Sequence, residues 1–109
     1  MINDRMKHPR VYIAGSISGL ERDEYMKKFH DVEEKLEQSG YTPMNPAKMC
    51  DTLPSLSHNE YLQVTIPLLK MSDFIYVIDG REESEGVKTE LLIAQREGIR
   101  ELRNTEPFF

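Results

Sequence analysis

Short apolar runs alternate with longer amphipathic stretches along this chain, and this alternation constrains the fold more than any other sequence feature. The clearest run is DFIYVID at residues 73–79, a nearly continuous apolar segment typical of a strand buried on both faces. A second run, VYIA at residues 11–14, is rich in β-branched and aromatic residues and ends at a glycine turn. Both segments predict short buried strands.

The stretches between these runs have the periodicity of amphipathic helices. Across residues 25–36, apolar side chains recur at helical spacing while lysine and glutamate fill the other face. Apolar residues at 61–69 indicate a second helix, in which Pro67 either begins a new turn or kinks the old one. Residues 87–94 carry the apolar stripe of a third helix.

Weaker signals complete the predicted order of elements. Residues 41–46, YTPMNP, contain two prolines, which restrict a strand there to an edge or a short run. Residues 47–57 are predicted to form a loop, and residues 99–102 could add a last short strand. Strands that alternate with helices imply right-handed crossovers, so we expect an α/β domain with a mainly parallel sheet covered on both sides.

Size and charge exclude several classes of function. With 109 residues, the chain can form one core, so residues 1–109 are predicted to be a single domain, with 1–9 as a flexible N-terminal extension. A net charge of −5 without a basic cluster argues against a nucleic-acid partner. No apolar stretch approaches the ~20 residues that span a bilayer, and no signal peptide is recognisable, so we expect a cytoplasmic protein without a membrane partner.

Ligands of open α/β sheets bind beyond the carboxyl ends of the strands. Here that rule selects residues 15–20, 45–48 and 79–89 as the places to search for chemistry. Asn45, at the end of the second predicted strand, could donate a hydrogen bond to a base or a ribose, although Asn-Pro is also ordinary turn chemistry. His58 is interpreted as a residue near a helix start.

The turn after the first strand contains Gly15 and Gly19 in a G-x-x-x-G spacing. This spacing fits neither the dinucleotide fingerprint nor the Walker loop. Two explanations stay open. Either the turn holds an anion with backbone N–H groups and the hydroxyls of Ser16 and Ser18, or it only supplies the positive φ angles of a strand-to-helix connection.

Glu90 is predicted to lie in or near the first turn of the last helix. A helix terminus there stabilises an ionised carboxylate by ~0.3–1 kcal/mol, which is the structural explanation. The functional explanation is that a carboxylate at this edge acts as a nucleophile or general base, oriented by Tyr12. Asp79, which ends the clearest strand, is the candidate acid. No pair of His, Cys or carboxylate residues has metal-ligand spacing, so no metal is expected.

Four segments in this order and spacing resemble the nucleoside 2-deoxyribosyltransferase-like superfamily, most closely its small bacterial and phage branch: YIAGSISG, MNPA, MSDFIYVIDG and ESEGVKTE. The resemblance covers nearly the whole chain. It implies a small flavodoxin-like or Rossmann-like three-layer domain that needs no cofactor. Such a domain cleaves or exchanges the N-glycosidic bond of a deoxynucleoside or its 5′-phosphate.

The same resemblance implies roles for individual residues. Glu90 matches the glutamate that attacks the anomeric carbon and forms a glycosyl-enzyme intermediate, and Tyr12 matches the tyrosine that hydrogen-bonds it. Three glycines and two serines match the turns that hold the sugar or its 5′-phosphate: Gly15, Ser16, Gly19, Ser84 and Gly86. Ser18, whose hydroxyl lies in the first of these turns, is a further substrate-binding candidate.

Two positions depart from the pattern of active members. The aspartate that assists the leaving base would stand near Thr65, which cannot act as an acid at neutral pH. The arginine that binds phosphate in the 5′-monophosphate hydrolases would stand at Ser18, and Arg22 could replace it. A nucleotide-binding or sensing module without catalysis is therefore the alternative hypothesis. An oligomer without any ligand is a third possibility.

The family habit of oligomerising favours a homodimer or larger homo-oligomer. Phe108 and Phe109 would then pack against a second subunit, although packing on the chain's own core is equally compatible with the sequence. Cys50, the only cysteine, cannot form a disulfide within the chain.

Overall fold

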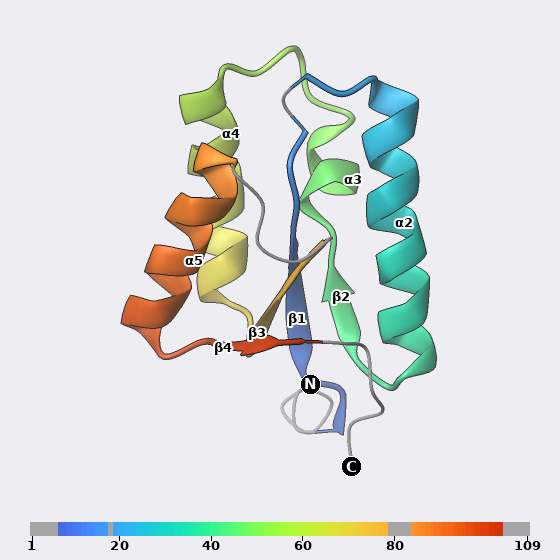
Figure 1. Cartoon of the computed structure of the whole chain (residues 1–109), viewed down its shortest axis with the longest axis vertical. Helices are drawn as coiled ribbons and strands as arrows, with labels where there is room; N and C mark the ends of the chain where they lie inside the picture. The colour runs from blue at the N-terminus through green and yellow to red at the C-terminus, as the bar shows by residue number, and fades with distance from the viewer. Residues whose placement is uncertain (1–6, 18, 79–83, 104–109) are drawn as a thin grey trace.

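The structure is a computed structural model that describes residues 7–17, 19–78 and 84–103 (Figure 1). Four parallel strands form one sheet in the order β2-β1-β3-β4. This sheet, with helices on both faces, confirms the predicted flavodoxin-like or Rossmann-like three-layer α/β fold. The elements in chain order are β1 (Arg10–Ala14), α2 (Arg22–Gln38), β2 (Thr42–Met44), α3 (Pro46–Cys50), α4 (His58–Lys70), β3 (Phe74–Val77), α5 (Glu85–Glu97) and β4 (Arg100–Leu102).

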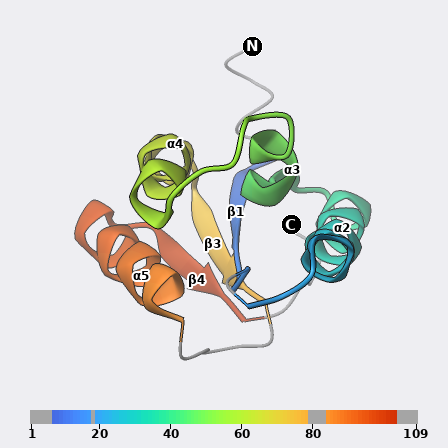
Figure 2. The ribbon, with the colours of Figure 1, turned by 90° about the horizontal axis from the view of Figure 1, so that it is seen from above.

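Strand β1 lies inside the sheet and divides the core into two layers. Its side chains alternate, as those of a strand must. Tyr12 and Ala14 belong to the layer under α4 and α5, whereas Val11 and Ile13 belong to the layer under α2 and α3. Figure 2 shows the two helical layers on opposite sides of the sheet. These four side chains are fully buried, whereas Arg10, at the start of β1, is half-buried.

The predicted loop at 47–57 is wrong in its first part, because residues 46–50 form the short helix α3. The Asn45 side chain caps this helix by accepting a hydrogen bond from the Lys48 backbone N–H, and Pro46 stands in the first turn, where its fixed φ suits a helix. Helix α4 continues through Pro67 to Lys70.

The strand order reverses between β1 and β3, since the chain runs from β1 to one neighbour and later returns to the other. The crevice beyond the carboxyl ends of such a strand pair is the usual ligand site of an open α/β sheet. Helices α4 and α5 both begin at this edge (Figure 1). Each starts at a capping serine, Ser57 and Ser84, whose hydroxyl accepts a backbone hydrogen bond.

The chain joins the sheet before β1 begins, because the Pro9 carbonyl accepts a hydrogen bond from the Thr42 backbone N–H at 2.9 Å. Residues 1–6 of the predicted N-terminal extension lie outside the described residues, as do Phe108 and Phe109. Among the helices of the described chain, none has both the length and the apolar character needed to cross a membrane.

Candidate functional site

A buried carboxylate and a buried phenol meet at the carboxyl edge of the sheet. The hydroxyl of Tyr12, on β1, donates a hydrogen bond to Oε2 of Glu90, on α5, with 2.5 Å between the two oxygens. Tyr12 is fully buried and Glu90 is 3% exposed. Residues 78 positions apart in the sequence are thus joined by a short hydrogen bond inside the protein.

Burial determines how Glu90 ionises. Removal from water disfavours the charged carboxylate and raises the Glu90 pKa to about 7, while the hydrogen bond from Tyr12 acts in the opposite direction. The helix-terminus explanation predicted a stabilised carboxylate, so it does not account for this residue. The Tyr12 pKa is held well above its ordinary value by burial and then by the nearby Glu90 charge, so the phenol stays a proton donor.

Glu90 lines a cavity of about 240 Å³, which we call the Glu90 cavity. Gly15 contributes to it from the turn after β1, and Ser84 and Gly86 contribute from the start of α5. The structure therefore brings together four of the residues that the sequence selected, at the point where the strand order reverses. Strongly shifted carboxyl groups that line cavities are typical of functional sites.

Packing under the turn leaves little room for a side chain at Gly15. A Cβ atom at this position would lie 3.0 Å from Cδ1 of Ile78 and 3.1 Å from Cζ of Phe29. Both neighbours belong to the layer under α2 and α3, so the absent side chain lets the turn pack closely on that layer. Gly19, by contrast, is exposed and has a φ of +79°, so it supplies the positive φ that one explanation of the turn required.

Other predicted residues are not among those that line the Glu90 cavity. Ser16 is half-buried and follows Gly15 in the sequence, but it does not line the Glu90 cavity. The buried Asn45 side chain caps α3 and donates a hydrogen bond to Glu33 at 2.8 Å. Arg22 forms a two-pronged ion pair with Asp51 at 2.8 and 2.6 Å. Asp79 and Ser18 lie outside the described residues.

Comparison with protein families identifies the chain. The sequence pattern of the domain of unknown function DUF4406 matches residues 9–101. The chain belongs to this family. The matched segment of this DUF4406 domain contains the Tyr12–Glu90 pair and every residue that lines the Glu90 cavity. A comparison with curated proteins found no match.

Sequence reasoning missed three ionisable side chains that line the cavity of this DUF4406 site, Tyr25, His58 and Tyr61, although it correctly placed His58 near a helix start. His58, the first residue of α4, lines the Glu90 cavity, and its Cε1 atom would lie 3.4 Å from a Cβ added at Gly86. A local signal was present, because Ser57 and Glu60 have the spacing of a capping box and do form one. That motif could have placed the start of α4, and with it His58, at the carboxyl edge.

Thr65 lies in the same layer as Tyr12 but does not line the cavity. It is fully buried, and its hydroxyl makes no hydrogen bond to any residue within the described segments. The hydroxyl lies close enough to the Tyr12 phenol to lower its pKa slightly against the larger effect of burial. Across the described parts of this DUF4406 domain, no group of three or more His, Cys, Asp or Glu side chains could hold a metal ion.

Proposed function

We propose that this DUF4406 domain cleaves or exchanges the N-glycosidic bond of a nucleoside or nucleotide, with Glu90 as the nucleophile. The observation that carries the proposal is the buried Tyr12–Glu90 pair at the wall of a cavity at the strand crossover. The resemblance to the nucleoside 2-deoxyribosyltransferase-like superfamily supports it, because the same two residues match that superfamily's nucleophile and its tyrosine partner.

The chemistry proceeds as two displacements at the anomeric carbon. An ionised Glu90 oxygen forms a bond to C1′ while the C1′–N bond breaks, and the electron pair leaves with the base nitrogen, which takes up a proton from solvent. Water or the N–H nitrogen of a second base then attacks C1′ and loses its proton to solvent, while the bond to the carboxylate breaks and restores ionised Glu90. The first acceptor gives hydrolysis, and the second gives transfer of the sugar.

Tyr12 orients the nucleophile in this scheme. Its hydrogen bond fixes one carboxylate oxygen, Oε2, and leaves Oε1 as the candidate attacking atom. The sugar would lie in the Glu90 cavity, which Ser84 and Gly86 help to line. Because the carboxylate must be ionised to attack, kcat/KM should rise as the pH passes about 7 and level off above it.

The first test is chromatographic detection of free base after incubation with 2′-deoxynucleosides and their 5′-monophosphates. We expect wild type to release base and Glu90→Gln to be slower by about 10³-fold or more, as for loss of a nucleophile. Glu85→Gln is the matched control, because Glu85 is on the same helix and its side chain is 84% exposed. Equal loss in both variants would contradict the role of Glu90.

A second candidate function is nucleotide binding without catalysis. It is favoured by Thr65, which stands near the place of the usual acid, is fully buried and does not line the Glu90 cavity. The same nucleosides and nucleotides should then raise the melting temperature of wild type without release of base. Base release that depends on Glu90 would exclude this candidate.

A further inference from the structure

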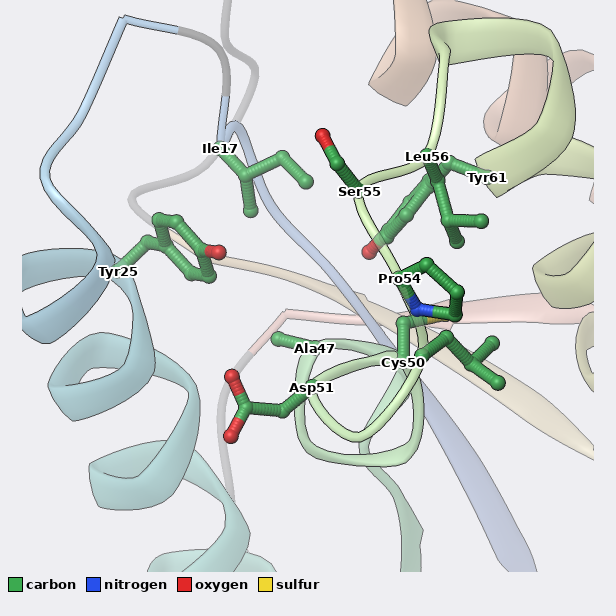
Figure 3. Close-up of a pocket in the computed structure, with 10 residues that line it drawn as sticks. Ile17, Tyr25, Ala47, Cys50, Asp51, Pro54, Ser55, Leu56 and Tyr61 are labelled. Carbon is green, nitrogen blue, oxygen red and sulfur yellow. The ribbon is translucent and has the colours of Figure 1, made fainter.

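The Glu90 cavity adjoins a second cavity of about 260 Å³, which we call the tyrosine lobe. Figure 3 shows the side chains that line the tyrosine lobe. The two cavities share four lining residues, Ile17, Tyr25, Leu56 and Tyr61. Each alone is smaller than the roughly 300 Å³ at which small-molecule pockets usually begin, whereas the two together exceed it. A ligand of ordinary size would therefore occupy both.

The tyrosine lobe has aromatic and apolar walls with a few hydroxyls. Tyr25 enters from α2 and Tyr61 from α4, and Figure 3 shows both hydroxyls directed into the space between them. Ala47 and Cys50 contribute from α3. Neither tyrosine hydroxyl has a hydrogen-bond partner among the described residues, so both are available to a ligand. Apolar walls with a few convergent polar groups are typical of sites for small organic ligands.

Tyr61 stands at the junction of the two cavities. Burial raises its pKa above the ordinary value of a phenol, and the charges of Glu90, Cys50 and Tyr25 act in the same direction. These electrostatic interactions place it near groups of both cavities. A phenol that stays protonated at neutral pH can donate a hydrogen bond to a carbonyl or ring nitrogen.

Charge indicates what the tyrosine lobe does not bind. Asp51 is its one charged lining residue, and no Lys, Arg or His is among the side chains described there. The Arg22 guanidinium near its edge is held by both oxygens of Asp51. A phosphate would therefore meet a carboxylate without a free cation, whereas a neutral planar ring would meet aromatic walls and hydroxyl groups.

We propose that the tyrosine lobe is the aglycone subsite, which takes the planar heteroaromatic base while the sugar lies against Glu90, and that Tyr61 positions the base. This inference rests on the proposed function. The residues that line both cavities would then surround the N-glycosidic bond, which joins the base to the sugar. It also separates two roles, since one cavity contains the nucleophile and the other recognises the leaving group.

The rate at which the single cysteine of the chain is alkylated can show whether the tyrosine lobe is occupied. Cys50 lines the tyrosine lobe and does not line the Glu90 cavity. Its pKa is raised by burial, so alkylation by iodoacetamide is measured at mildly alkaline pH, where more thiolate is present. We expect adenine, guanine, cytosine or thymine, tested singly, to slow alkylation several-fold for at least one base. An equal concentration of 2-deoxyribose 5-phosphate should leave the rate unchanged.

Variants separate positioning from folding. Tyr61→Phe should keep the alkylation rate measured without ligand but require a several-fold higher base concentration for half protection. Tyr76→Phe is the matched control, because Tyr76 packs in the other core layer and lines neither cavity. Loss of protection in Tyr76→Phe as large as in Tyr61→Phe would overturn the role of Tyr61.

The outcomes distinguish the two proposals. Protection by a base without catalytic base release would support the tyrosine lobe as a base site and contradict the glycosidase. Glu90-dependent base release without protection, or with equal protection by the sugar phosphate, would overturn the aglycone subsite alone. Absence of both base release and protection would overturn both.

Discussion

The side chains on the two faces of β1 are buried to the same extent, but their surroundings differ. Tyr12 and Ile13 are neighbours in one strand, and both are fully buried. Ile13 faces hydrocarbon, packed in one layer with Phe29 and Leu36 from α2. Tyr12 faces the layer of α4 and α5, where Glu90 and Thr65 are buried polar side chains. One face is an ordinary core, and the other contains an ionisable pair.

This difference indicates which face contains residues that do not maximise the stability of the fold. A carboxyl group taken out of water destabilises the folded state once it is ionised, and a leucine in its place would not. The layer under α2 avoids that penalty with aliphatic and aromatic side chains, whereas the layer under α5 accepts it at a cavity wall. Departures from local rules of stability are expected at functional sites.

The largest expected effect tests the apolar face. Leu36 is fully buried on α2 and lines neither the Glu90 cavity nor the tyrosine lobe. Leu36→Ala should lower the free energy of unfolding by about 2–5 kcal/mol, because it leaves a cavity in a packed core. Urea denaturation measures this change. Base release per folded molecule should stay at the wild-type value. A parallel loss of activity would contradict the view that this face serves only stability.

The next effect tests the ionisable face. Folding raises the Glu90 pKa from its ordinary 4.5 to about 7. Below pH 4.5 both folded and unfolded chains hold the proton, so the penalty is absent. As the pH rises from 4.5 through 7, the unfolded chain loses its proton first and the folded state loses stability, by about 3 kcal/mol in total.

Glu90→Gln removes this titration. Its unfolding free energy relative to wild type should therefore increase by about 3 kcal/mol between pH 4.5 and pH 8, measured by urea denaturation at each pH. Glu85→Gln, on the exposed side of the same helix, should show no such trend. A flat difference for Glu90→Gln would mean that Glu90 is not buried as a titrating group.

Much of the fold could be predicted from the sequence because its two central strands, β1 and β3, are short apolar runs. The expected strand at 73–79 is observed as Phe74–Val77, and that at 11–14 as Arg10–Ala14. Helix α3 was missed because five residues show no helical periodicity. Its only local signals are the cap at Asn45 and the proline that follows, which resemble a turn equally well.

The candidate site was predictable where residues lie on β1, in the turn after it, or at the start of the helix that follows β3. Gly15, Ser84 and Gly86 meet because the ends of β1 and β3 are adjacent, which the alternation of elements implies. His58 and Tyr61 come from a helix that follows a long irregular segment, so no strand end pointed to them. The side chain of Asn45 lies at the correct edge but is used to cap α3.

The variant with the smallest expected change in the free energy of unfolding, Tyr12→Phe, tests the difference between the two faces of β1 most sharply. Tyr12→Phe removes one hydrogen bond to the ionised Glu90 and leaves the ring in place, so the free energy of unfolding should fall by about 2 kcal/mol at pH 8. The Tyr12 hydrogen bond lowers the Glu90 pKa. Its loss should therefore move that pKa above about 7.

Two independent curves should record this shift. The pH at which kcat/KM is half-maximal should rise, and the loss of stability attributed to Glu90 should extend to higher pH than in wild type. Tyr76→Phe, which removes a phenol from the other layer, should change neither midpoint. If Tyr12→Phe altered stability without moving either curve, its hydroxyl would be a packing group like those on the opposite face, and Glu90 would ionise without its help.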